Sequence, residues 1–76
     1  MKETLKVIIS NLVDNKDAVE INQVDGDKSI VFEVKVAEGD MGKVIGRQGR
    51  LAKSIRTVMK ALAAKEHKKV SVEFIG

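Results

Sequence analysis

Residues 42–56, GKVIGRQGRLAKSIR, hold the strongest structural signal in the sequence. Two glycines, Gly46 and Gly49, enclose only two residues, and the apolar pair Val44 and Ile45 precedes them. A basic segment with helical spacing of its apolar residues follows. Glycine adopts positive φ angles and lets another backbone come close, and the basic neighbours favour a phosphate chain as partner. The stretch therefore predicts a tight loop between two helices that faces a polyanion.

Hydrophobic periodicity predicts six elements around this loop. Apolar residues at helical spacing indicate helices, and apolar residues at alternate positions indicate strands. The expected elements are a helix over 2–13, a strand over 18–24, a strand over 30–36, a short helix over 41–45, a helix over 50–65 and a strand over 70–75. Their order is α-β-β-α-α-β.

The same pattern predicts which side chains form the core. In the second strand, the inward set is Ile30, Phe32, Val34 and Val36. On the long helix, the expected apolar stripe is Leu51, Ile55, Val58, Met59 and Leu62. We also expect Phe74 to lie with Phe32 between the layers.

The element order predicts an α+β fold, a two-layer sandwich with a three-stranded mixed sheet and the helices on one face. The first two strands flank the turn Asp25-Gly26-Asp27, which favours an antiparallel hairpin. A two-helix crossover joins the second strand to the third, which favours a parallel pair. The 76 residues are expected to form a single domain over residues 1–76.

Charge is distributed unevenly along the chain. Residues 1–42 hold five Lys and nine Asp or Glu, a net charge of −4, whereas residues 43–76 hold nine Lys or Arg and two Glu, a net charge of +7. The two add to the overall +3. This asymmetry indicates that one region faces a polyanion, although a solvated basic helix face produces the same pattern.

Several classes are disfavoured by composition. There is no cysteine, which excludes disulfides and thiolate metal sites. No apolar run approaches the roughly 20 residues that span a bilayer, and the N-terminal segment lacks the pattern of a signal peptide. We therefore expect a cytoplasmic protein without membrane contact, metal or cofactor.

The I-G-x-x-G pattern of residues 45–49, set between two helices in this element order, resembles a type II KH domain. Three segments are similar to the small single-domain bacterial KH proteins of the KhpA type: VDN at 13–15, DMGKVIGRQGR at 40–50 and IRTV at 55–58. The resemblance covers essentially the whole chain. It implies single-stranded RNA as partner, no small-molecule substrate, and a role as an RNA chaperone or post-transcriptional regulator linked to cell elongation, division and cell shape.

The loop chemistry agrees with this resemblance. A GXXG loop clamps about four nucleotides of backbone, and the following helix N-terminus favours anions. The expected RNA-binding residues are Lys43, Val44, Ile45, Gly46, Arg47, Gln48, Gly49, Arg50 and Lys53. By the resemblance, bases lie in an apolar groove between the helices and a neighbouring strand. Val44, Ile45 and residues of the second strand could line it, although plain core packing explains these residues equally.

Two further stripes lie on the long helix. Gly49, Lys53, Arg56 and Lys60 recur at spacings of 4, 3 and 4, a basic stripe whose far end fits a solvated face. The small residues Ser54, Thr57, Ala61 and Ala64 recur at spacings of 3, 4 and 3. These small residues permit close helix approach, or are simply good helix formers on a surface. The KhpA resemblance implies a homodimer or a heterodimer with a KhpB-type KH protein, and this small-residue stripe is the candidate interface.

Three other functions compete with RNA binding. An enzyme is disfavoured because the glycine spacing GxxxGxxG of residues 42–49 matches neither the dinucleotide-binding pattern G-x-G-x-x-G nor the P-loop. The sequence also lacks the sets of catalytic residues that an active site requires. His67, the one histidine, suits a helix C-terminus. A DNA-binding helix-turn-helix remains an alternative, but it does not need glycine at both ends of a two-residue turn. A pure protein-interaction module is the third possibility.

Overall fold

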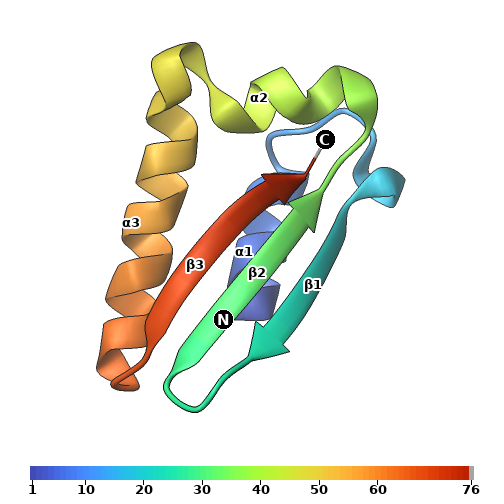
Figure 1. Cartoon of the computed structure of the whole chain (residues 1–76). Helices are drawn as coiled ribbons and strands as arrows, with labels where there is room; N and C mark the ends of the chain where they lie inside the picture. The colour runs from blue at the N-terminus through green and yellow to red at the C-terminus, as the bar shows by residue number, and fades with distance from the viewer. Residues whose placement is uncertain (76) are drawn as a thin grey trace.

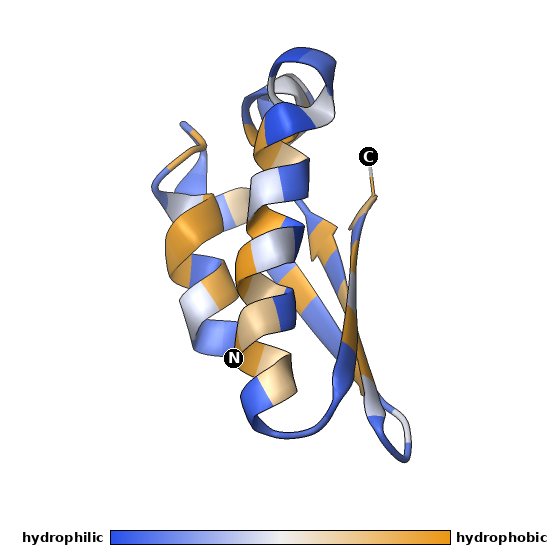
Figure 2. Cartoon of the chain, turned by 90° about the vertical axis from the view of Figure 1, so that its left-hand side faces the viewer, coloured by the Kyte–Doolittle hydropathy of each residue, from blue (hydrophilic) through white to orange (hydrophobic). Residues whose placement is uncertain are grey.

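The computed structural model describes residues 1–75, in which three helices cover one face of a three-stranded sheet (Figures 1 and 2). The helices and strands are α1 (Lys2–Ser10), β1 (Glu20–Asp25), β2 (Ser29–Lys35), α2 (Met41–Ile45), α3 (Arg50–Lys65) and β3 (Lys69–Ile75). Three single-turn 3₁₀ helices connect them: Lys16–Ala18, Glu38–Asp40 and Arg47–Gly49. The predicted two-layer α+β sandwich and its element order are confirmed.

The sheet has the order β1-β2-β3. β1 pairs antiparallel with β2, with Gln23 opposite Phe32, and β2 pairs parallel with β3, with Phe32 opposite Val72. Both pairings follow the sequence-based prediction. Because β2 is central, β3 is an edge strand, and α3 runs beside it (Figure 1).

The core lies between the sheet and the helices. β2 contributes Ile30, Phe32 and Val34, each at most 2% exposed, and Val36 beyond its end is also buried, as predicted. The helices contribute fully buried Leu5, Ile9 and Met59 to the same cluster. Burial of this apolar surface is the main force that holds the two layers together.

On α3, the buried stripe differs from the predicted one. Its residues are Ala52, Ile55, Met59 and Ala63. Leu51 and Leu62 are half-buried, and Val58 is 45% exposed, so the prediction that Val58 packs in the core was wrong. Two alanines take the inward positions, which lets the helix approach the sheet closely and turns the larger Val58 toward solvent.

Phe74 lies in the inward set of β3 with Val70 and Val72 and packs against the core, as predicted, although it is only half-buried. The Arg56 guanidinium of α3 lies 5.4 Å from the centre of its ring, within the range of a cation–π contact. The first helix is shorter than predicted. It ends at Ser10, where the Asn11 backbone N–H and side-chain Nδ2 both donate to the Val7 carbonyl.

The chain reverses sharply between α3 and β3. His67 adopts a left-handed conformation with φ 57°. Its N–H donates to the Ala64 carbonyl, and the Lys68 N–H donates to the Ala63 carbonyl at 3.0 Å. This is the Schellman arrangement that ends many helices. It brings the start of β3 back alongside the last turns of α3.

Candidate nucleic-acid interface

The loop between α2 and α3 has the backbone that its two glycines predict. Gly46 has φ 76° and ψ 179°, a region open essentially to glycine alone, and Gly49 is left-handed with φ 74° and ψ 13°. Gln48 between them is left-handed too, with φ 55°. Three positive φ angles within four residues turn the chain from α2 into α3.

The two glycines meet different surroundings. A Cβ at Gly46 would lie 2.7 Å from the Leu51 Cβ and 3.1 Å from the Leu51 amide nitrogen. A Cβ at Gly49 would meet nothing within 4 Å. Gly46 therefore lets the loop pack against α3, whereas Gly49 leaves an open approach to the backbone.

The start of α3 is open to an anion. No side chain bonds to its first amides, and the residue before it, Gly49, has no side chain to offer. The N–H groups of Gly49 and Arg50 donate to the Gly46 and Arg47 carbonyls of the loop. The amides that follow them in the first turn have no partner within the helix, and the dipole of this 16-residue helix adds positive potential there. Such an N-terminus binds phosphate readily.

Four predicted donors surround this N-terminus. The side chains of Arg47, Gln48, Arg50 and Lys53 are all exposed. Among residues 1–75, the ion pairs involve only Lys43 with Asp14 and Asp40. The three cations among the four donors are therefore unpaired and available to an incoming phosphate chain.

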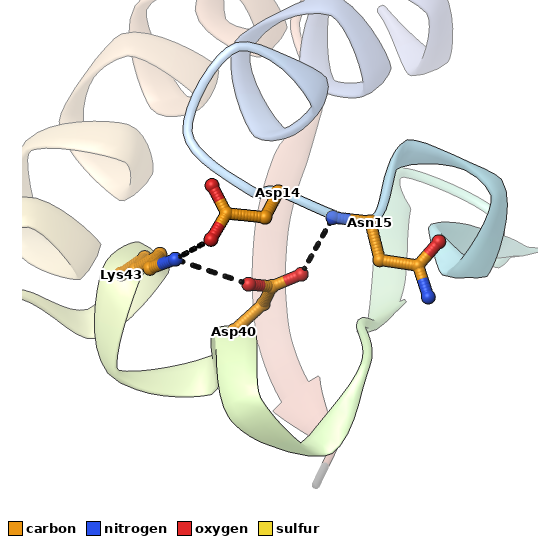
Figure 3. A network of polar contacts seen from close by, with 4 residues as sticks. All are labelled: Asp14, Asn15, Asp40 and Lys43. Atoms are coloured by element: carbon orange, nitrogen blue, oxygen red, sulfur yellow. Dashed lines mark hydrogen bonds and ion pairs between the residues drawn. The ribbon is translucent and has the colours of Figure 1, made fainter.

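Lys43, also predicted to bind RNA, is engaged with two carboxylates (Figure 3). Its ammonium contacts Asp14 and lies 3.5 Å from Asp40 Oδ1, while Asp40 Oδ2 accepts the Asn15 backbone N–H at 3.0 Å. The contact with Asp14 is the chief cause that raises the pKa of Lys43. This network ties the loop after α1 to the start of α2, so Lys43 holds the scaffold behind the glycine loop.

Asp40 is the centre of this network and is only 4% exposed. Its pKa lies below the ordinary value of 3.8, chiefly because the Asn15 N–H stabilises the carboxylate. The stabilisation is therefore full at neutral pH and is lost as the pH falls below that ordinary value. We expect Asp40→Asn to lower the thermal unfolding midpoint by several degrees at pH 7, with a difference from wild type that shrinks near pH 3. Asp14→Asn, at the exposed partner of Lys43, is the matched control and should lower the midpoint by less. Calorimetry across the pH range measures both variants, and equal effects would contradict the central role of Asp40.

The two apolar residues before the loop differ in how deeply they are buried. Val44, predicted to line an RNA groove, is fully buried and packs in the core, so its side chain offers no surface to a ligand. Ile45 is half-buried and keeps part of its surface accessible. The inward residues of β2 are buried as well. β3 is the strand that runs beside α3 (Figure 1).

The small-residue stripe lies on the exposed side of α3. Ser54, Thr57, Ala61 and Ala64 are all exposed. The hydroxyls of Ser54 and Thr57 each donate at 3.0 Å to the carbonyl four residues earlier. Their polar groups are thus occupied within the helix, and exposed Val58 adds apolar surface to the same side.

Sequence reasoning missed the role of Arg56. Its Nε donates to the Val72 carbonyl on β3 at 3.1 Å, so the side chain bridges α3 and the edge strand. The spacing placed Arg56 on the basic stripe but contained no signal for a partner 16 positions away. The structure thereby shows that this stripe faces β3.

Residues 1–75 lack two features. No helix in that part of the chain is long and apolar enough to cross a membrane. No group of three or more His, Cys, Asp or Glu side chains there is arranged to hold a metal ion.

The chain is similar to a known family over almost its whole length. The family described as KhpA/KhpB, KH domain, matches residues 2–74. The RNA-binding protein KhpA of Caldanaerobacter subterraneus subsp. tengcongensis is 59% identical over 75 residues, which cover 99% of this chain and all of that protein. The RNA-binding proteins KhpA of Clostridium perfringens and Aquifex aeolicus are 57% and 39% identical over 75 residues, 99% of this chain and 100% and 95% of theirs. No solved structure matches the chain significantly.

Proposed function

The chain belongs to the KhpA/KhpB family of KH domains, and from this premise we propose that it binds single-stranded RNA, with the loop Gly46–Gly49 as the clamp on the RNA backbone. The family is non-catalytic. The relatives above are named RNA-binding proteins, which supports RNA as the ligand.

One observation carries this proposal. An open glycine, Gly49, stands directly before the uncapped N-terminus of α3, and the unpaired cations Arg47, Arg50 and Lys53 surround it. Backbone amides and cations can then bind successive phosphates without a side chain in the way. A tight loop of this kind suits the backbone of a single strand better than that of a duplex.

The proposal is tested by titrating single-stranded RNA at increasing salt. Each phosphate contact releases counterions, and for single strands the slope of log K against log salt is about −0.7 per contact. Contacts from Arg47, Arg50 and Lys53 should give a slope of about −2, or a loss of roughly 20-fold in affinity between 50 and 200 mM salt. A duplex of the same sequence should bind more weakly. Tighter duplex binding would instead favour a DNA-binding helix-turn-helix.

Within the cell, we propose that this binding serves post-transcriptional regulation or RNA chaperoning in the cytoplasm. The support is the resemblance to KhpA-type proteins. The same resemblance implies a link to cell elongation, division and cell shape. Sequencing of RNA crosslinked to the protein in cells identifies the transcripts, and a set with no enrichment over total RNA would contradict a regulatory role.

We also propose that the small-residue face of α3 pairs with a second KH domain, in a homodimer or in a heterodimer with a KhpB-type protein. Two observations support this face. The small residues are exposed and their hydroxyls already donate to carbonyls of α3, and Val58, which is 45% exposed, adds apolar surface. Ala61→Glu places a charge at its centre and should shift the dimer toward monomer by at least tenfold in Kd, because an unpaired charge in a closed interface is costly. Analytical ultracentrifugation measures this, with exposed Thr4→Glu on α1 as control; an unchanged oligomeric state would count against this face.

A further inference from the structure

Three lysines surround a hollow at the opposite end of α3 from the clamp loop. Lys60 comes from the second half of α3, and Lys68 and Lys69 come from the start of β3. The hollow has a volume of about 360 Å³, and Val70 and Ser71 form the rest of its wall. The sequence alone assigned Lys60 to a solvated face, because nothing in its spacing showed that the other two lysines return to it.

The fold brings these lysines together by a specific turn. The left-handed His67 and the bond from the Lys68 N–H to the Ala63 carbonyl reverse the chain directly after α3. The backbone N–H of Lys69 then donates to the Lys28 carbonyl at 2.9 Å, which fixes the start of β3. The positions of Lys68 and Lys69 beside Lys60 are therefore set by backbone hydrogen bonds.

The charges around this hollow are uncompensated. In the part of the chain that the structure describes, none of Lys60, Lys68 and Lys69 has a carboxylate within 4.0 Å or a side-chain hydrogen bond. All three are exposed. Like charges that line one concave surface raise its positive potential and attract anions.

A row of cations connects the hollow to the clamp. Lys53, Arg56 and Lys60 follow one another on α3 at spacings of 3 and 4, which places them on one side of the helix. That side faces the edge strand, since Arg56 bonds to the Val72 carbonyl and Lys60 shares the hollow with Val70 and Ser71. We call this row of α3 residues and the adjoining edge of β3 the α3–β3 seam; Figure 1 shows the two elements side by side.

The length of the seam fits an extension of the RNA. From Arg50 to Lys60 the helix advances by ten residues, or about 15 Å. A stacked strand rises by about 3.4 Å per nucleotide, so this distance spans about four nucleotides. A ligand that fills the clamp with about four nucleotides therefore reaches the hollow when it is about eight or nine nucleotides long.

We propose that Lys60, Lys68 and Lys69 form a second phosphate-binding site, which engages the backbone of single-stranded RNA that continues from the clamp along the α3–β3 seam. This inference rests on the proposed function of the clamp. It predicts a footprint about twice that of the GXXG loop, with the additional contacts made to phosphates and therefore tolerant of base sequence.

The test compares two oligonucleotides and two triple variants. Fluorescence anisotropy measures the binding of oligouridine of about four and about nine nucleotides to the full chain. For wild type we expect roughly tenfold tighter binding of the longer RNA, since three exposed charge pairs contribute modestly each. Lys60→Gln/Lys68→Gln/Lys69→Gln should remove this gain and leave the binding of the short RNA nearly unchanged. The control Lys2→Gln/Lys6→Gln/Lys16→Gln removes the same charge from exposed lysines outside α3 and β3.

The outcomes separate the two proposals. Failure of wild type to bind either RNA refutes the clamp. Binding of the short RNA with no gain from the longer one overturns the second site and leaves the clamp intact. A gain that survives in the Lys60→Gln/Lys68→Gln/Lys69→Gln variant does the same. Equal losses in both triple variants show a general charge effect and also overturn it. Circular dichroism confirms that each variant is folded, as exposed lysines allow.

Discussion

Replacement of Arg47 and Gln48 together by Asp should weaken the binding of single-stranded RNA by roughly 100-fold at low salt. The change removes one cation and introduces two anions at the clamp, a difference of three charge units. Exposed charge interactions contribute up to about 1 kcal/mol each, and 1.4 kcal/mol corresponds to tenfold in affinity. The salt dependence should flatten as well, because fewer counterions are released.

The fold should tolerate this double change, since both side chains are exposed and neither makes a side-chain hydrogen bond within residues 1–75. Thr4→Glu/Lys6→Glu is the matched control. It alters the net charge by the same three units at exposed positions on α1. If the control weakens RNA binding as much as the loop variant does, the protein attracts RNA through its overall charge, and the clamp hypothesis fails.

The fold follows from the sequence wherever one strong pattern decides a local choice. The alternation of Ile30, Phe32 and Val34 predicts the second strand, because apolar residues at every second position face the same side of a sheet. The pattern was ambiguous on α3, where apolar residues occupy more than one side. There the close packing of Ala52 and Ala63 determines the orientation, and Val58 faces outward against its hydrophobicity.

The candidate site divides in the same way. Gly46 and Gly49 carry their conformational meaning in their identity, so the loop was predictable. The contact of Lys43 with Asp14 was not, because Asp14 lies 29 positions away and only the packed loop brings it near. Arg56 and the three lysines of the hollow, Lys60, Lys68 and Lys69, follow the same rule, since each arrangement depends on where β3 lies beside α3.

Substitution of the two loop glycines should affect different properties, stability at Gly46 and RNA affinity at Gly49. Gly46→Ala should lower the free energy of unfolding by about 2–4 kcal/mol. Backbone of this kind costs a side chain about 1–3 kcal/mol, and the crowding against Leu51, 2.7 Å between Cβ positions, adds to it. A domain of this size has a total of roughly 4–11 kcal/mol, so the unfolding midpoint should fall by about 10 °C or more.

Gly49→Asn is the control within the same loop. Asparagine tolerates the left-handed conformation of this position, and a Cβ there meets nothing within 4 Å. The stability should therefore stay within about 1 kcal/mol of wild type. RNA affinity should nevertheless fall at least tenfold, because the new side chain occupies the open approach to the helix N-terminus that the phosphates need.

Thermal unfolding and RNA titration of the two variants together decide whether the glycines have separate roles. A stable Gly49→Asn protein that binds RNA as wild type does would show that the strand does not approach the backbone at that position. A Gly46→Ala protein that unfolds at the wild-type temperature would show that the contact with Leu51 relaxes freely. With both expected results in hand, Gly46 is the residue that shapes the clamp and Gly49 is the residue that admits the RNA, because only one of the two is crowded by the protein itself.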